Sequence, residues 1–216
     1  MLGLKDRIAV VTGAASGIGR AIALRLAEEG VQPVIFDVDD AGAASVVEEA
    51  GTTGGKASAQ HCDITDYASV QAAVEATERD VGPIDFLVNN AGWDLPTSFL
   101  DSEPDFWGKG IGINLMGPIH MHHVVLNRMA ARGSGRVVNI ASDAGRVGSS
   151  GEAVYSACKG GVIAFTKTLA REVARKGITL NTVCPGPTDT PLFDAFKEAS
   201  TDGARIADGL ARAIPM

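Results

Sequence analysis

The apolar residues of this chain follow two alternating patterns: short continuous runs, and longer segments in which they recur every three or four positions. The runs are typical of parallel strands buried on both faces, and the longer segments are typical of helices with one buried face. Strands are predicted at 8–11, 34–36, 58–62, 85–88, 136–140 and 178–183. Helices are predicted at 17–29, 41–50, 66–79, 106–131 and 155–175. The alternation continues without a break in composition, so residues 1–216 are predicted to form a single doubly wound α/β domain, a Rossmann-like fold with a parallel sheet.

Composition and charge narrow the classes of partner. Of the 216 residues, 45% are hydrophobic and 21% are charged, which is enough to bury a sizeable core. The net charge of −7 makes nucleic acid and anionic membrane surfaces poor partners, because both are held largely by positive charge. No apolar run approaches the ~18 residues that span a bilayer. The N-terminal residues also lack the basic-then-apolar order of a signal peptide, so a cytoplasmic protein is expected.

The side chains that most often bind metals are scattered. His120 and His123 could face one ion from a predicted helix, but His122 between them could not join them, and we interpret all three as packing or surface residues. No metal site is predicted. The three cysteines lie far apart without a CxxC spacing, which favours buried thiols over a disulfide scaffold or a zinc site. They are Cys62, Cys158 and Cys184.

A glycine-rich turn follows the first predicted strand. It is Thr12-Gly13-Ala14-Ala15-Ser16-Gly17-Ile18-Gly19, and a helix begins within it. Ligands of doubly wound folds bind outside the carboxyl ends of the strands. Glycines there allow the backbone to approach a phosphate, and the helix N-terminus offers free N–H groups to the anion. The spacing differs from the common G-x-G-x-x-G, but its place between strand and helix favours dinucleotide binding over a simple turn.

Polar residues also end the next strands. Asp37 ends the second strand, where a carboxylate can bind ribose hydroxyls and would repel a 2′-phosphate, so NAD is predicted over NADP. Asp63, after the third strand, could reach the adenine edge or could make a turn at a helix N-terminus, and both remain open. Asn89-Asn90-Ala91-Gly92 follows the fourth strand, and either a turn that ties neighbouring loops or a cofactor wall fits it.

Ser142, Tyr155 and Lys159 form the strongest constellation. Ser142 stands at the end of the fifth strand, and Tyr155 and Lys159 share a helical face at i and i+4. Oxidation of an alcohol by hydride transfer needs a base for the hydroxyl proton, and a free tyrosine with a pKa near 10 is too weakly acidic to serve as phenolate near neutrality. The ammonium of Lys159 and a positive nicotinamide ring would lower that pKa, while Ser142 would hold the substrate oxygen.

With these residues in place, the chain resembles the classical short-chain dehydrogenase/reductase family. The motifs that carry the resemblance occur in the family's order and span nearly the whole chain. They are Thr12-Gly13-(x3)-Gly17-Ile18-Gly19, Asn89-Asn90-Ala91-Gly92, Asn114, Ser142, Tyr155-(x3)-Lys159 and Pro185-Gly186-(x3)-Thr190.

The resemblance implies further roles. Asn114 would join Ser142, Tyr155 and Lys159 as a catalytic residue by binding a water that links Lys159 to solvent. It also implies a homo-oligomer (a tetramer in the family), a substrate lid at about 188–216, and a C-terminal edge strand of the sheet that is apparently missing from this sequence. Thr188 and Thr190 would contact the nicotinamide amide and the phosphates. The implied cofactor-binding residues are Gly13, Ser16, Gly17, Ile18, Gly19, Asp37, Asp63, Ile64, Asn90, Ala91, Gly92, Tyr155, Lys159, Pro185, Gly186, Thr188 and Thr190.

The expected function is therefore an NAD-dependent oxidoreductase that acts on the secondary alcohol of a small molecule. The loops at 90–94, 120–123 and 142–155 resemble those of family members that oxidise hydroxyacyl-CoA thioesters, such as 2-hydroxycyclohexane-1-carboxyl-CoA. Two alternatives remain: a reductase that works on a 3-oxoacyl thioester, and an NAD-binding sensor without turnover. Trp93 could line the substrate site or simply pack at its rim.

Overall fold

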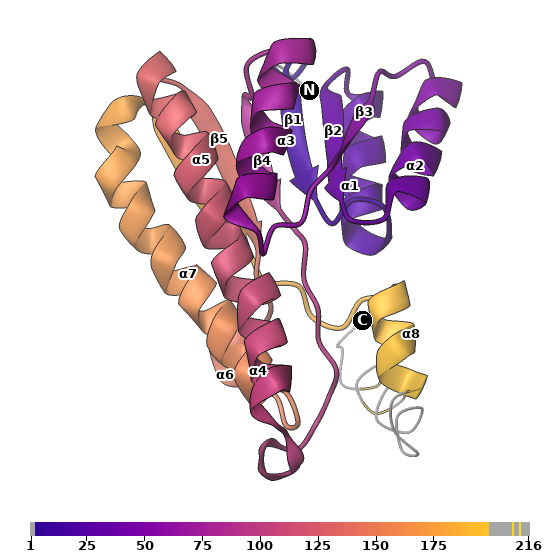
Figure 1. The fold of residues 1–216 in the computed structure, drawn as a ribbon, viewed down its shortest axis with the longest axis vertical. Helices are drawn as coiled ribbons and strands as arrows, with labels where there is room; N and C mark the ends of the chain where they lie inside the picture. Colours follow the sequence, from indigo (N-terminus) through magenta and orange to yellow (C-terminus); the bar gives the residue numbers. More distant parts are fainter. Residues whose placement is uncertain (1–2, 199–208, 210–211, 213–216) are drawn as a thin grey trace.

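A sheet of six parallel strands runs through the middle of the molecule (Figure 1). The computed structural model describes residues 3–198, 209 and 212. The strands lie in the order β3-β2-β1-β4-β5-β6, so the winding reverses between β1 and β4, the position at which doubly wound sheets bind ligands. The predicted Rossmann-like fold is confirmed. The strands are β1 Ile8–Thr12, β2 Gln32–Asp37, β3 Ser58–His61, β4 Phe86–Asn89, β5 Gly135–Ile140 and β6 Ile178–Val183.

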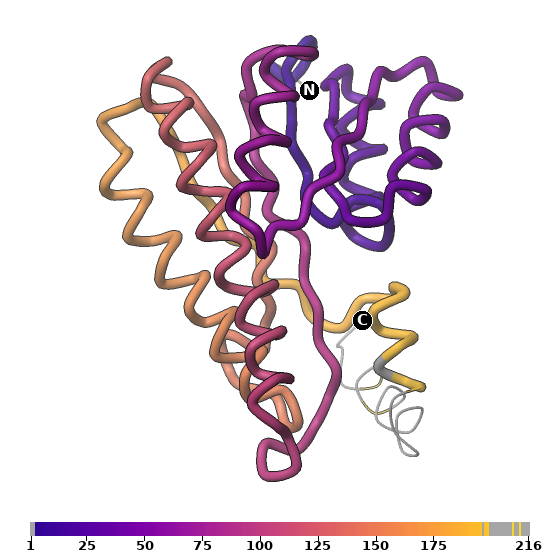
Figure 2. Tube along the Cα trace, viewed as in Figure 1, coloured from indigo at the N-terminus to yellow at the C-terminus, as the bar shows by residue number. Residues whose placement is uncertain are grey.

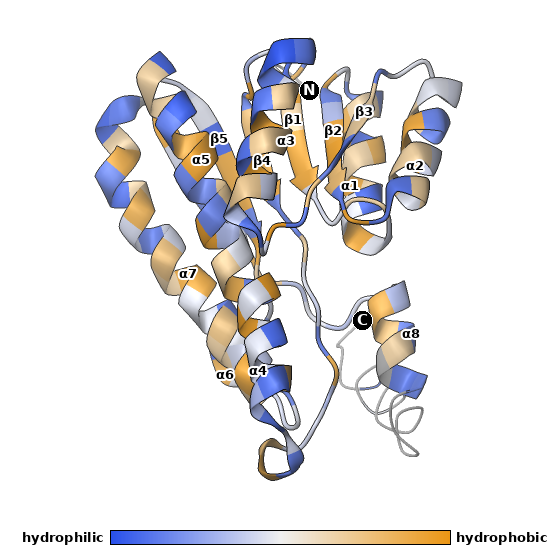
Figure 3. Ribbon diagram, in the orientation of Figure 1, coloured by the Kyte–Doolittle hydropathy of each residue, from blue (hydrophilic) through white to orange (hydrophobic). Residues whose placement is uncertain are grey.

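Helices cover both faces of this sheet. Helices α1 and α2 pack on one face, and α3, α5 and α7 pack on the other. Val10 and Val11 illustrate the arrangement, since these successive residues of β1 point into the two different cores and are both fully buried. The central strands are accordingly apolar along their length (Figure 3). The helices are α1 Gly17–Glu28, α2 Asp40–Thr52, α3 Tyr67–Asp80, α4 Pro104–Ile111, α5 Gly117–Arg132, α6 Ala144–Val147, α7 Ala153–Val173 and α8 Pro191–Glu198.

The helix predicted at 106–131 is present but is not uniform. A π-helical segment, Gly112–Met116, joins α4 to α5 without a break. Wider π turns are frequent at functional sites, and this one buries Asn114 completely. The short helices α6 and α8 were not predicted from the apolar pattern, because neither is long enough to show a period. Ahead of α4, the chain leaves β4 as a long extended segment and turns back beside it (Figure 2).

A polar network crosses the core on the α5 and α7 side of the sheet. Asn139 Nδ2 donates to Thr166 Oγ1 at 2.8 Å and to His122 Nε2 at 3.2 Å, and its Oδ1 accepts from Asn89 Nδ2 at 2.8 Å. His122 Nδ1 donates to the Pro118 carbonyl at 2.6 Å. Both imidazole nitrogens of His122 are thus satisfied in the neutral form, as a buried polar group requires. A proton added at Nε2 would face the amide hydrogens of Asn139.

We predict that His122 makes the fold sensitive to acid. Burial lowers the pKa of His122 from its ordinary 6.5 to about 4, so the stability it contributes is complete above pH 6.5 and is lost as the pH falls toward 4. The free energy of unfolding should drop by about 2 kcal/mol between pH 7 and pH 5 from this group. Urea unfolding at both pH values measures the drop.

His122→Gln should lose this part of the pH dependence. His61→Gln is the matched control, because the His61 side chain is 58% exposed and lies on the surface. An undiminished drop in His122→Gln would show that other groups are responsible.

Candidate active site

The glycine-rich turn lies at the end of β1, packed against the segment that follows β4. Gly13 and Gly17 have φ values of +62° and +55°, a left-handed conformation that favours glycine. A Cβ on Gly19 would lie 2.3 Å from the Gly13 carbonyl oxygen and 2.4 Å from Asn90 Nδ2. Only glycine therefore allows α1 to begin this close to the strand ends. Ser16 precedes α1, and its side chain makes no capping hydrogen bond.

Asn90 ties the ends of β1 and β4 together. Its Nδ2 donates to the carbonyl oxygens of Thr12 and Gly13, both at 3.0 Å. Thr12 Oγ1 accepts in return from the backbone N–H groups of Asn90 and Ala91, at 3.0 and 3.1 Å. Of the two interpretations left open for this motif, the structure shows the tie between loops. The same bonds hold the backbone of Ala91 against Gly13, where a Cβ on the glycine would lie 2.6 Å from Ala91 Cα.

The two candidate aspartates differ in their surroundings. Asp37 Oδ2 accepts from the backbone N–H of Ala15 at 2.9 Å, so its carboxylate lies against the glycine turn. Asp63 Oδ1 instead accepts from the N–H and the hydroxyl of Thr65, at 2.8 and 2.7 Å. Asp63 thus makes the turn contact that was left open, ahead of α3. The side chain of Ile64 is buried in the core, so any contact of Ile64 with a cofactor would come from its main chain.

The structure brings Ser142, Tyr155 and Lys159 together. The Ser142 hydroxyl is near enough to the Tyr155 hydroxyl to lower the pKa of Tyr155, and Lys159 Nζ lies 5.4 Å from the centroid of the Tyr155 ring. Lys159 is buried and donates to the Ile140 carbonyl at 3.0 Å. This juxtaposition depends on Gly145, where a Cβ would lie 2.7 Å from Gly160 N, because α6 rests directly on α7 and carries the Ser142 segment with it.

Asn114 uses its carboxamide to hold the segment after β4. Its Oδ1 accepts from the Trp93 N–H at 3.1 Å, and its Nδ2 donates to the Trp93 and Gly110 carbonyls at 2.6 and 3.0 Å. Both amide hydrogens are therefore committed, so the water that the family resemblance implies would have to donate to Oδ1. Asn114 lies near Lys159, since a Cβ on Gly92 would be 3.2 Å from Asn114 Oδ1 and 3.4 Å from Lys159 Nζ.

Burial shifts both ionisable groups of this cluster away from their charged forms. Burial raises the pKa of Tyr155 to about 12, the Ser142 hydrogen bond opposes the rise, and the charges of Asp94 and Glu152 add to it. Burial also lowers the pKa of Lys159 to about 8. The sequence analysis expected a lowered pKa for Tyr155, but the protein groups alone raise it. The expectation did not include desolvation or the two carboxyl groups.

The C-terminal motif returns the chain to the glycine turn. The Pro185 carbonyl accepts from Asp143 N–H at 3.0 Å, and the Gly186 carbonyl accepts from Thr188 Oγ1 at 3.0 Å. Thr190 precedes α8, with its Oγ1 accepting from the Phe193 N–H at 3.3 Å, and its Cβ would be 3.7 Å from a Cβ on Gly17. Of the expected lid at 188–216, residues 199–208, 210–211 and 213–216 lie outside the described residues.

A sequence profile of the short chain dehydrogenase family matches residues 7–201. The chain belongs to the short chain dehydrogenase family. It is 38% identical over 197 residues to the 3-oxoacyl-(acyl-carrier-protein) reductase FabG of Vibrio harveyi, an alignment that covers 91% of this chain and 80% of that protein. It is 39% identical over 194 residues to an acetoacetyl-CoA reductase of Rhizobium meliloti, with 89% of this chain and 78% of the relative covered.

Solved structures of other family members have the same fold. NAD+-bound xylitol dehydrogenase superposes with a TM-score of 0.91 at 32% identity and covers 99% of this chain and 86% of its own. A variant of actinorhodin polyketide ketoreductase with NADPH superposes with a TM-score of 0.85 at 34% identity, over 100% of this chain and 92% of its own. These matches and the family profile make this protein an oxidoreductase that acts on hydroxyl or keto groups.

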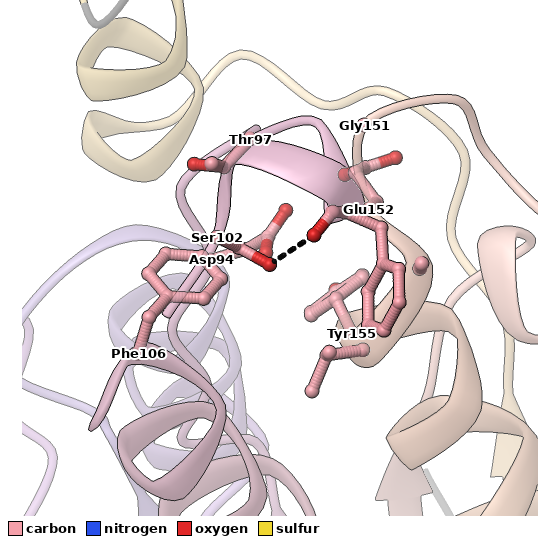
Figure 4. A pocket seen from close by; sticks show the side chains of 10 residues that line it. Asp94, Thr97, Ser102, Phe106, Gly151, Glu152 and Tyr155 are labelled. Atoms are coloured by element: carbon pink, nitrogen blue, oxygen red, sulfur yellow. Dashed lines mark hydrogen bonds between the residues drawn. The ribbon is translucent and has the colours of Figure 1, made fainter. Parts of the chain in front are cut away.

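Two site residues were missed by the sequence analysis, Asp94 and Glu152. Both line a small cavity together with the catalytic candidate Tyr155 (Figure 4). Their positions were a possible signal, because Asp94 stands two residues after Gly92 of the Asn90–Gly92 motif and Glu152 stands three residues before Tyr155. Trp93 packs nearby, with its ring 5.2 Å from Phe106 and the Lys109 ammonium 4.2 Å above it.

The histidines have structural partners. His120 Nδ1 bonds the Ile64 carbonyl at 3.0 Å, and His123 Nδ1 bonds the Tyr67 hydroxyl at 2.7 Å. Within the part of the chain that the structure describes, no group of three or more histidine, cysteine or acidic side chains could hold a metal ion. None of the described helices is long and apolar enough to cross a membrane.

We predict that Gly19→Ala disrupts the glycine turn. The new methyl group would meet the Gly13 carbonyl oxygen and Asn90 Nδ2, so the free energy of unfolding should fall by about 1–3 kcal/mol. Gly51→Ala is the control, because Gly51 lies in α2 with no atom within 4 Å of its would-be Cβ, and should raise stability by about 0.5–1 kcal/mol. Urea unfolding compares the two. A Gly19→Ala protein as stable as the parent would contradict the close packing described here.

Proposed function

We propose that this protein transfers a hydride between NAD and the carbinol or carbonyl carbon of an acyl thioester, with Tyr155 as acid and base. The observation that carries the proposal is that Ser142, Tyr155 and the buried Lys159 are brought together, with Lys159 Nζ 5.4 Å from the centroid of the Tyr155 ring and Ser142 near enough to lower the pKa of Tyr155. Ser142 follows the carboxyl end of β5, and the glycine turn follows the carboxyl end of β1, so in this parallel sheet both lie at the same edge. A sensor without turnover would have no need of such a base.

The residues around the glycine turn fit a nicotinamide dinucleotide. Gly13 and Gly17 adopt left-handed conformations, and the first turn of α1 offers N–H groups to a pyrophosphate. Asp37 would accept the ribose hydroxyls, and a 2′-phosphate would meet its negative charge. Solved relatives hold NAD+ or NADPH, so the preference for NAD rests on Asp37. A bound nicotinamide ring would supply the hydride acceptor or donor.

Tyr155 would move the proton of the substrate oxygen, and Ser142 would hold that oxygen through its hydroxyl. Moving the pKa of Tyr155 from about 12 to near 7 requires about 7 kcal/mol of differential interaction. One positive charge at ~4 Å contributes about 4 kcal/mol at an effective dielectric constant of 20. Lys159 alone therefore does not suffice, and a second positive charge, such as that of an oxidised nicotinamide ring, is needed for the phenolate to form.

The substrate class is supported by the relatives. FabG and acetoacetyl-CoA reductase are named for the reduction of 3-oxoacyl and acetoacetyl thioesters, so reduction is at least as well supported as oxidation. 2-Hydroxycyclohexane-1-carboxyl-CoA as the substrate stays a more specific prediction. The names of the relatives reported above refer to other substrates. The homotetramer and the lid at 188–216 are likewise retained as parts of this proposal.

We predict that Tyr155→Phe abolishes turnover but spares cofactor binding. The ring remains while the proton donor is lost, so kcat should fall by at least about 100-fold. The assay follows NADH absorbance with acetoacetyl-CoA, and with 3-hydroxybutyryl-CoA and NAD in the opposite direction. Tyr67→Phe is the matched control, because Tyr67 is the only other tyrosine and bonds His123. Near-parent activity in Tyr155→Phe would remove Tyr155 from the chemistry.

We predict that Asp37→Asn relaxes the choice of cofactor. Asparagine keeps an acceptor for the Ala15 N–H and removes the charge that would repel a 2′-phosphate. The ratio of kcat/KM for NAD to that for NADP should fall by about tenfold or more. Asp40→Asn serves as the control, because that carboxylate is 73% exposed and pairs with His61. Equal use of both cofactors by the parent protein would exclude the assigned role of Asp37.

A further inference from the structure

The cavity beside Tyr155 is small and is bounded by two chain segments. Its volume is about 10 Å³, enough for one small polar group. One wall comes from the extended segment after β4, and the other from the start of α7. The Thr97 N–H donates to the Gly151 carbonyl at 2.8 Å and holds the two segments together. The lining residues are Asp94, Thr97, Phe99, Ser102, Phe106, Gly151, Glu152, Ala153, Val154 and Tyr155 (Figure 4).

Two acidic side chains, Asp94 and Glu152, line this cavity. Asp94 Oδ2 is buried and has no hydrogen-bond partner among the described residues. Burial, followed by the Glu152 contact, raises the pKa of Asp94 to about 8. The two side chains can carry only negative charge, and burial disfavours that charge at Asp94.

The nearby cations do not neutralise this charge by direct contact. Lys159 acts on Asp94 only through space, because its ammonium donates to the Ile140 carbonyl. Lys109 lies over the ring of Trp93. The cavity therefore presents a net negative charge next to Tyr155. The charge of the pair also reaches the Tyr155 hydroxyl, whose pKa it raises further.

We propose that Asp94 and Glu152 form a specificity site that accepts an uncharged carbonyl or hydroxyl group of the substrate and rejects a carboxylate. This inference rests on the proposed function, since it assumes that the substrate reacts at Tyr155. The unpartnered Asp94 Oδ2 can accept from a hydroxyl, and the neutral form of the Asp94 carboxyl can donate to a carbonyl oxygen. A free hydroxy or oxo acid would place a second negative charge against the first. The site thus selects acyl thioesters and esters over the corresponding free acids.

The test compares two small substrates that differ in this charge, methyl acetoacetate and acetoacetate, each with NADH. The parent protein should favour the ester over the acid by about 100-fold in kcat/KM. Glu152→Gln and Asp94→Asn should each reduce this ratio by at least about tenfold, mainly through faster turnover of the acid. Asp101→Asn should leave the ratio unchanged, because Asp101 is an exposed carboxylate of the same segment and does not line the cavity.

The outcomes separate this inference from the proposed function. Failure of the parent to reduce either compound, or acetoacetyl-CoA, would refute the proposed function itself. Reduction of both compounds at similar rates by the parent would overturn the specificity site alone. The specificity site would also be overturned if both variants fold, as judged by thermal unfolding, and keep the parent's ratio of kcat/KM for the ester to that for the acid. The comparison of the ester with the acid in the parent protein tests the proposal even if a variant fails to fold.

Discussion

The tie between the carboxyl ends of β1 and β4 is the constraint on which the rest of the site depends. Asn90 Nδ2 donates to the Thr12 and Gly13 carbonyls, and Thr12 Oγ1 accepts from the backbone N–H groups of Asn90 and Ala91. These contacts join β1 and β4, the two strands between which the sheet reverses its winding. With the strand ends fixed, no side chain fits at Gly19, and the first turn of α1 is held close to the ends of β1 and β4. The same backbone then leads from Ala91 to Gly92, which lies over Lys159 and Asn114.

Buried polar groups fix the other half of the site. Lys159 is held by the Ile140 carbonyl, and Ile140 directly follows Asn139 in the core network with His122 and Thr166. Each partner in that network lies on a different element, so the network holds β4, β5, α5 and α7 in one register. An unpaired group there would cost about 1–3 kcal/mol. The position of the Lys159 ammonium therefore depends on residues that never contact a substrate.

The fold and the positions of the candidate site residues in it could be predicted because they depend on local pattern. All six described strands lie where the sequence predicted them, most of them at apolar runs, and the residues that end or follow them, such as Asp37 and Ser142, lie at the edge where ligands bind. The i, i+4 spacing placed Tyr155 and Lys159 on one helical face. The π turn around Asn114 could not be predicted, since it depends on the pairing of Asn114 with Trp93 across the fold. The meeting of Asp94 with Glu152 likewise depends on packing between distant segments.

The misjudged pKa of Tyr155 shows what sequence spacing leaves out. A lysine four residues away predicts a lowered pKa, but spacing does not show how far both groups are removed from water. In the folded protein burial dominates, and it pushes Tyr155 and Lys159 toward their neutral forms together. The negative charges of Asp94 and Glu152 raise the pKa of Tyr155 further, because they oppose formation of the phenolate. The protein groups alone therefore hold Tyr155 in its neutral form, and a further positive charge beside the hydroxyl would favour the phenolate.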